Sequence, residues 1–338
     1  MAVPVLLNVL ASTSDKLKSL EIDIACTPTQ LHALSTPLFS ALRLRRLFVR
    51  DAPGDGWQRA AGGPPGAYDA VSQLADDLGK HATVTELGLR RAPLRAGAFP
   101  RLVAASLANR LSCAIFVECA LRPEAAPSLT ALFGAGSLET LHVLNAQEEL
   151  LDAATVGPFA AAIRSSRSLK HCVLAMCRLW EDPVVGNAVV EAFVGHRTVR
   201  GLSFLGNPIV PADRVAAGGA LARLVAPPPP QAPHAQDGGA ALAPPPPLQP
   251  QPLASLNVSV CFLGDDGLRL LLHALPSNST LRALRFSGSA VSGAFARSVL
   301  LPSIVANVGL RELQAGLDPN IPEMAQSEAV VAARGAGV

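Results

Sequence analysis

The chain has 338 residues, of which 49% are apolar but only 4% are aromatic, and its formal net charge is +2. This length allows one or two domains with a sizeable core, which Leu, Val and Ala must fill. The small net charge argues against nucleic acid or an anionic membrane as a general partner. There is no run of 18 uncharged apolar residues to span a bilayer.

The first 16 residues contain a short apolar run that no Lys or Arg precedes, which is not typical of a signal peptide. We predict that residues 1–16 form a helix capping one end of a repeat array. The six cysteines show neither a CxxC pair nor a Cys/His spacing typical of a metal site. Reduced thiols in the cytoplasm are the simplest interpretation, and we predict no cofactor and no metal.

A Leu-x-x-Leu-x-Leu motif, with other apolar residues allowed at the Leu positions, occurs ten times. The copies begin at Leu17, Leu44, Val84, Leu111, Leu138, Leu169, Val199, Leu253, Leu281 and Leu310. Seven of the nine intervals between them are 27 to 31 residues, and the other two, of 40 and 54, each contain a Gly- or Pro-rich insert. The motifs predict strands, and helical spacing of apolar residues predicts helices over 70–79, 99–110, 156–166 and 267–275. One such unit cannot bury its own apolar face, so the units must stack.

Residues after the motif add a second signal. In four copies the ninth position of the motif is an asparagine or a cysteine: Cys119, Cys177, Asn207 and Cys261. The turns LGDDG at 263–267 and VSG at 291–293 are predicted to lead into helices. From about residue 17 to 331 the chain resembles leucine-rich repeats of the ribonuclease-inhibitor-like subclass. The resemblance implies an α/β fold: a right-handed βα solenoid, or horseshoe, of about ten repeats with a parallel concave sheet and helices on the convex side.

The resemblance also implies a role for the ninth residue, which points into the solenoid and hydrogen-bonds the backbone of adjoining turns. Six copies have Ala, Ser or Asp there instead, and Ala146 is one example. These repeats are predicted to have a weaker polar ladder and looser turns.

The two inserts set the predicted domain organisation: a cap at 1–16, repeats one to seven at 17–225 with an insert at 51–66, a loop at 226–252, and repeats eight to ten at 253–338. The loop holds eleven of the 29 prolines and cannot form a packed core, so we predict that it is exposed and disordered. It is either a tolerated low-complexity insertion or a docking segment for a proline-recognising domain.

The third, fifth and seventh positions of each motif point away from the core and, within the resemblance, line the concave face. In the middle repeats they are largely apolar, which predicts a partner-binding patch. Its candidate residues are Ile115, Val117, His142, Leu144, His171 and Val173. The alternative is that irregular repeats tuck these side chains between neighbours. His142 and His171 lie on adjacent strands, but a third metal ligand is lacking.

The first repeats present arginines on the same face. Arg46, Arg50 and Arg90 are candidates for contact with an acidic protein or a phosphate, because guanidinium groups suit both. The alternative is an ordinary solvated rim.

Sequence motifs of catalysis are missing: there is no GxGxxG, Walker loop, HExxH or GxSxG. We therefore predict a noncatalytic scaffold, with no catalytic residues, that binds a protein of unknown identity and neither nucleic acid nor membrane. The resemblance leaves open a regulator of a small GTPase, or the repeat section of a larger receptor, ubiquitin-ligase adaptor or bacterial effector.

Overall fold

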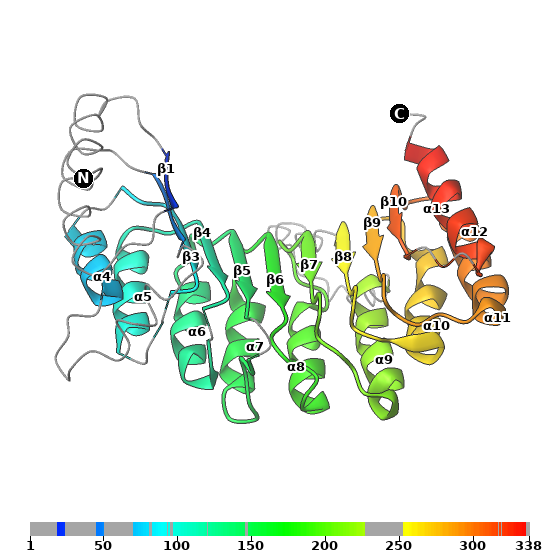
Figure 1. Ribbon diagram of the computed structural model, residues 1–338, viewed down its shortest axis with the longest axis horizontal. Coiled ribbons are helices and arrows are strands. Elements are labelled where there is room, and N and C mark those ends of the chain that lie inside the picture. The colour runs from blue at the N-terminus through cyan, green and yellow to red at the C-terminus, as the bar shows by residue number, and fades with distance from the viewer. Residues whose placement is uncertain are drawn as a thin grey trace, which may run out of the picture. The chain divides into compact units, whose positions relative to one another are not determined.

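The computed structural model describes residues 19–23, 45–50, 70–80, 83–92, 94, 97–119, 121–145, 148–226, 253–316, 318 and 320–335 (Figure 1). The predicted cap at 1–16 and the insert at 51–66 lie outside the described residues, as does the proline-rich segment 226–252 apart from Ala226. The chain divides into two compact units. Unit 1 comprises Met1–Val189 and Ser203–Pro208, and unit 2 comprises Val190–Leu202 and Ile209–Val338.

Unit 1 alternates parallel strands with helices. Its strands are β1 (Ser19–Asp23), β2 (Arg46–Arg50), β3 (Glu86–Arg90), β4 (Cys113–Val117), β5 (Thr140–Leu144) and β6 (His171–Ala175). Its helices are α4 (Ala70–Lys80), α5 (Ala98–Ala108), the 3-10 turn η1 (Pro123–Ala125), α6 (Ala126–Gly134) and α7 (Val156–Ser165). Helix α8 (Pro183–Phe193) and strand β7 (Gly201–Ser203) contain the boundary with unit 2. Consecutive strands from β1 to β6 are hydrogen-bonded neighbours.

Unit 2 repeats this arrangement with shorter strands, β8 (Ser255–Asn257), β9 (Ala283–Arg285) and β10 (Glu312–Gln314). Its helical segments are η2 (Pro211–Asp213), α9 (Arg214–Val225), α10 (Gly264–Ala274), η3 (Leu275–Ser277), α11 (Gly293–Phe295), η4 (Ala296–Leu300), α12 (Leu301–Ala306) and α13 (Pro322–Gly335). Strands β8, β9 and β10 pair in parallel and in chain order.

Each of the ten motifs forms a strand that begins at its third position. In β5, Leu141 and Val143 are fully buried while Thr140, His142 and Leu144 are partly exposed. This alternation follows from the two-residue period of a strand, which sends successive side chains to opposite faces. The predicted fold class, a parallel-sheet α/β solenoid in which strands alternate with helices, is confirmed for the described part of the chain.

The core of unit 1 lies between the sheet and its helices, where aromatic residues meet edge to face. Phe99 of α5 packs on Phe116 of β4 with ring centroids 5.3 Å apart, and Trp180 packs on Phe204 at 5.9 Å. All four side chains are almost wholly buried. Such edge-to-face contacts add to the stabilisation from burial. The first pair joins helix α5 to strand β4, and the second joins the segments that follow β6 and β7.

The residue at the ninth position of repeat seven stabilises the turns as the resemblance implies. The Asn207 side-chain amide donates to the Leu174 and Phe204 carbonyls at 2.7 and 2.8 Å, and its Oδ1 accepts from the Cys177 and Leu179 amides at 2.9 and 3.2 Å. The side chain is completely buried. It therefore satisfies buried backbone groups of two successive repeats, within or just after their strands.

Repeat five departs from the sequence-based expectation. In place of the ninth-position residue Ala146, Asn145 at the eighth position forms the ladder. Its Oδ1 accepts from the Leu121 amide at 2.6 Å, and its Nδ2 donates to the Glu148 carbonyl at 3.0 Å. A polar ladder is thus present in this repeat, because an asparagine displaced by one residue still reaches the neighbouring turn.

A second asparagine ladder lies at the other end of the strands, and sequence analysis missed it. Asn278 donates to the Val225 carbonyl at 2.6 Å, and Asn307 donates to the Leu275 carbonyl at 2.6 Å. Asn109 makes the equivalent bond to the Leu78 carbonyl at 3.0 Å. Each asparagine therefore ties the turn before a strand to the carboxyl end of a preceding helix, where carbonyl groups lack intrahelical partners.

Candidate functional site: the open face of unit 1

The sheet of unit 1 has one face that the described helices do not cover, here called the open face (Figure 1). Strand register places its outward residues in rows. The fifth-position row runs Phe48, Gly88, Ile115, His142 and Val173 across β2 to β6. The row is apolar except for one histidine, so the open face carries an uncharged stripe between the ends of the strands.

The seventh-position row is less uniform. From β2 to β6 it runs Arg50, Arg90, Val117, Leu144 and Ala175, and Asp23 of β1 precedes Arg50. Val117 and Leu144 are partly exposed, whereas Ala175 is buried. The row therefore changes from basic to apolar between β3 and β4.

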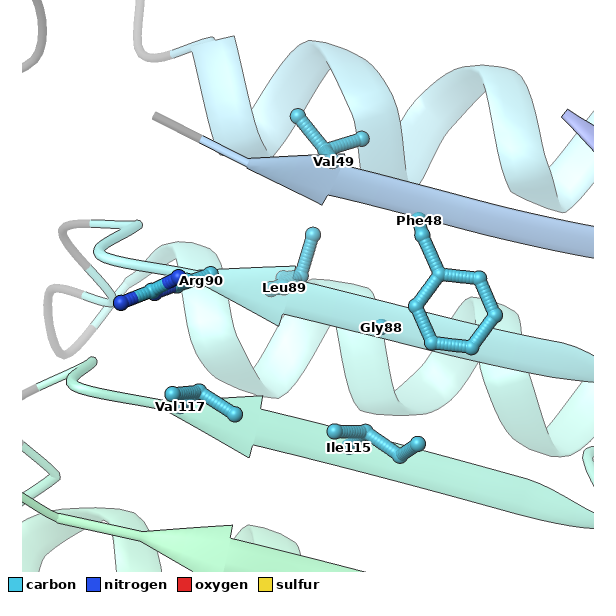
Figure 2. A pocket seen from close by; sticks show the side chains of 7 residues that line it. All are labelled: Phe48, Val49, Gly88, Leu89, Arg90, Ile115 and Val117. Carbon is cyan, nitrogen blue, oxygen red and sulfur yellow. The ribbon is translucent and has the colours of Figure 1, made fainter. Parts of the chain in front are cut away.

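A cavity of about 260 Å³ opens on this face between β2, β3 and β4. Figure 2 shows the ring of Phe48 lying across Gly88, with Ile115 and Val117 on the next strand and Arg90 at the end of β3. A Cβ atom at Gly88 would lie 2.2 Å from Cδ1 of Phe48, so the ring occupies this place only because residue 88 has no side chain. The cavity thus depends on a pairing of Phe with Gly across two strands.

Ion pairs hold the charged groups at both ends of the cavity's strands. At the amino end, Arg46 Nε lies 2.7 Å from Glu86 Oε2. At the carboxyl end, Glu118 contacts two guanidinium groups: Arg91 Nε donates to it, and Arg90 Nη2 lies 3.5 Å from its Oε1. The hydrogen bond from Arg91 is the main cause that lowers the pKa of Glu118 below its usual value. One carboxylate therefore serves two arginines.

The two histidines of the predicted patch are close neighbours. His142 is in register with Val173, and His171 with Thr140, so the imidazoles lie diagonally on adjacent strands. Burial, followed by the proximity of His171, lowers the pKa of His142 below its usual value. His142 is therefore neutral at neutral pH. No group of three or more His, Cys, Asp or Glu side chains within the described residues is placed to hold a metal ion.

The cysteines of the described residues are free thiols. Cys119, Cys172 and Cys177 are buried, and burial raises the pKa of Cys119 and of Cys172 to about 12. Cys113 stands on the open face, and burial, followed by the charge of Glu86, raises its pKa to about 11. All four remain protonated at neutral pH, the form with little nucleophilic or metal-binding character.

The structure brings together residues that the sequence had assigned to separate zones. Ile115 and Val117 of the predicted apolar patch line the same cavity as Arg90 of the predicted basic group. The rest of the patch lies on β5 and β6, and Arg46 lies at the amino end of β2, paired with Glu86. Arg50 lies at the end of β2 in register with Arg90, and its side chain lies outside the described part of the chain.

Sequence analysis did not single out Phe48 and Gly88 as site residues. Each occupies the fifth position of its motif: Phe48 in the copy that begins at Leu44, and Gly88 in the copy that begins at Val84. Aligning the motifs pairs this large side chain with a glycine on the neighbouring strand, so the pairing could have been recognised from the sequence.

No protein-family model matches the chain, and no curated protein matches it. Among solved structures, the chain is similar to leiomodin-1 actin-binding site 2, with 13% identity, 56% of this chain and 75% of that chain covered, and a TM-score of 0.28. It is also similar to TLR13 in a complex with ssRNA13, with 13% identity, 89% of this chain and 36% of that chain covered, and a TM-score of 0.43. At these values neither similarity says what the chain does.

Proposed function

We propose that the chain is a noncatalytic scaffold that binds a protein partner on the open face of unit 1. The observation that carries this proposal is the set of four aliphatic side chains that remain partly exposed there. They are Ile115, Val117, Leu144 and Val173, on three adjacent strands. Apolar side chains gathered on a face that tolerates polar ones are typical of protein interfaces.

Further observations support the remaining parts of the proposal. The asparagine ladder at Asn207 and the repeat length of 27 to 31 residues support the ribonuclease-inhibitor-like subclass. Protonated thiols support a noncatalytic role, since a cysteine nucleophile needs its thiolate form. Free cysteines also support a reducing compartment such as the cytoplasm. None of the described helices combines the length and hydrophobicity that a membrane crossing requires.

Affinity purification with quantitative mass spectrometry tests the proposal. The bait is the full chain, compared with a variant that carries Ile115→Ser, Val117→Ser, Leu144→Ser and Val173→Ser. The matched control is Val184→Ser, which replaces a 69% exposed valine on helix α8. We expect the wild type and the control to retain the same protein and the fourfold variant to lose it.

Circular dichroism melting shows whether the fourfold variant is folded. Because the four side chains are outside the core, its melting temperature should lie close to that of the wild type. Equal capture by a folded fourfold variant would falsify the proposal.

A further inference from the structure

The cavity at Phe48 has the size of a single side chain. Its volume of about 260 Å³ is below the roughly 300–1,000 Å³ of sites for complete small molecules. Its walls include the ring of Phe48 and the aliphatic side chains of Ile115 and Val117 (Figure 2). Such walls favour an apolar group, because they offer it dispersion contacts and release water from an apolar surface.

Arg90, at one end of this cavity, has unused hydrogen-bonding capacity. Its Nε is buried and has no hydrogen-bond partner among the described residues. Its contact with Glu118 is long, at 3.5 Å, and the same carboxylate accepts a hydrogen bond from Arg91. The Arg90 side chain is 42% exposed, and because its Nε is buried, the part that an outside carboxylate can reach is the terminal end of the guanidinium group. A guanidinium–carboxylate pair with two parallel hydrogen bonds is stronger than the contact it has now.

We propose that this cavity receives one large apolar side chain of the partner protein, and that Arg90 binds a carboxylate two residues from that side chain in the partner's sequence. The inference rests on the proposed function, since it specifies which segment of a partner the open face recognises. The partner segment is expected to be both acidic and apolar, because the apolar walls and the undersatisfied guanidinium of Arg90 occur side by side.

The spacing of the two features sets the motif. Arg90 follows Gly88 by two residues on the same strand, which corresponds to about 7 Å. An extended partner advances by about 3.3 Å per residue, and its side chains add reach. Because successive side chains of an extended chain point to opposite faces, the carboxylate belongs two residues from the apolar anchor.

Phage display tests this inference with a random peptide library selected against the full chain. The strongest peptide is then synthesised with a fluorescent label, and its affinity is measured by fluorescence anisotropy. We expect selected sequences to share a large apolar residue with Asp or Glu two positions away. Replacing that acid by its amide should weaken binding about tenfold or more, the usual size of a charge-assisted hydrogen bond.

Variants of the chain identify the residues that bind the peptide. Arg90→Gln should weaken binding about tenfold, whereas Arg101→Gln, an exposed arginine of helix α5, should leave it unchanged. Glu118→Gln should strengthen binding, because it removes the competitor for Arg90. Gly88→Ala should weaken it, because the new Cβ displaces the Phe48 ring. Melting temperatures confirm that each variant is folded.

A double-mutant cycle gives the decisive result. If the peptide's acid pairs with Arg90, the amide peptide loses no further affinity for Arg90→Gln. Additive losses, a consensus without an acid, or the absence of any enriched peptide would each overturn the inference. Peptides that lose binding with Leu144→Ser and Val173→Ser, but not with Arg90→Gln or Gly88→Ala, overturn the inference and leave the proposed function standing.

Discussion

Strands β8, β9 and β10 of unit 2 present a different outer surface from strands β2 to β6 of unit 1, although both sets bury the same kind of residues. In unit 2 the outward residues include Ser255, Asn257 and Gln314, and Arg285 pairs with Glu312 through Nε at 2.9 Å. In unit 1 the fifth-position row is mostly apolar and opens into a cavity. Core positions are thus held constant by packing, while outward positions are free to differ and to bind.

Asn207 in unit 1 and the close approach of Gly218 to Gly267 in unit 2 fix the packing in opposite ways. In unit 1 the asparagine Asn207 binds two turns together inside the core. In unit 2 helices α9 and α10 approach through glycines: a Cβ at Gly218 would lie 2.3 Å from the Gly267 carbonyl oxygen. One contact depends on a side chain and the other on its absence, so opposite kinds of substitution should disrupt them.

The largest effect is expected from Asn207→Ala in unit 1. It leaves four buried backbone groups without their partner, which should lower the free energy of unfolding by about 3 kcal/mol or more. Asn257→Ala, at an outward position of β8 in unit 2, removes one hydrogen bond, from the Ser259 amide. It should lower the free energy of unfolding by about 1 kcal/mol or less. Urea unfolding followed by circular dichroism measures both. If Asn207→Ala lowered the free energy of unfolding no more than Asn257→Ala, the hydrogen bonds of Asn207 would not stabilise the fold as expected.

Gly218→Ala in unit 2 should lower the free energy of unfolding by about 2 kcal/mol, because the helices must separate. Its neighbour is the control. A Cβ at Gly219 meets its first neighbour, Leu270, at 3.8 Å, so Gly219→Ala should raise stability by up to about 1 kcal/mol through helix propensity. Thermal melting distinguishes the two, and the same sign for both would contradict the close approach.

Val260→Gly in unit 2 should raise stability by up to about 1 kcal/mol, since Val260 is a branched residue with φ of 58° and Gly relieves that strain. Unit 1 offers the converse at the same repeat position. Gly206 has φ of 69°, and a Cβ there would lie 2.9 Å from Met176 Cγ, so Gly206→Ala should destabilise. Crystal structures of both variants would show whether the turns keep their conformation.

The smallest effect concerns pH and distinguishes the open face of unit 1. The folded-state pKa of His142 lies below its ordinary value, so the unfolded chain binds the proton more readily. Stability should therefore fall as pH decreases through the ordinary histidine pKa toward the folded one, and level off below it. His142→Leu should remove this part of the pH dependence, measured by urea unfolding between pH 5 and pH 8. His273→Leu, on an exposed site in α10, serves as the control.

The start of helix α10 and the cavity of unit 1 were each predicted only in part from the sequence. Helix α10 was expected over 267–275 but spans Gly264–Ala274. Asp265 and Asp266 therefore lie in its first turn rather than before it. Asp265 accepts from the Ser292 amide at 2.9 Å, a contact between repeats that no local pattern reveals. At the site, Ile115 and Val117 were foreseen, but the cavity's Phe48 and Gly88 were not.

The sequence by itself determined the repeat, the position of each strand and most of the outward residues, because a spacing of two and a recurring motif are local properties of the chain. Gly88, Ala175 and Ser259, which the same alternation placed outward, are buried. Only the tertiary structure decided that Phe48 lies over Gly88, that one Glu118 is shared by two arginines, and that Asn145 takes over the ladder. These depend on register and side-chain reach between residues about one repeat apart, which are fixed only once the repeats stack.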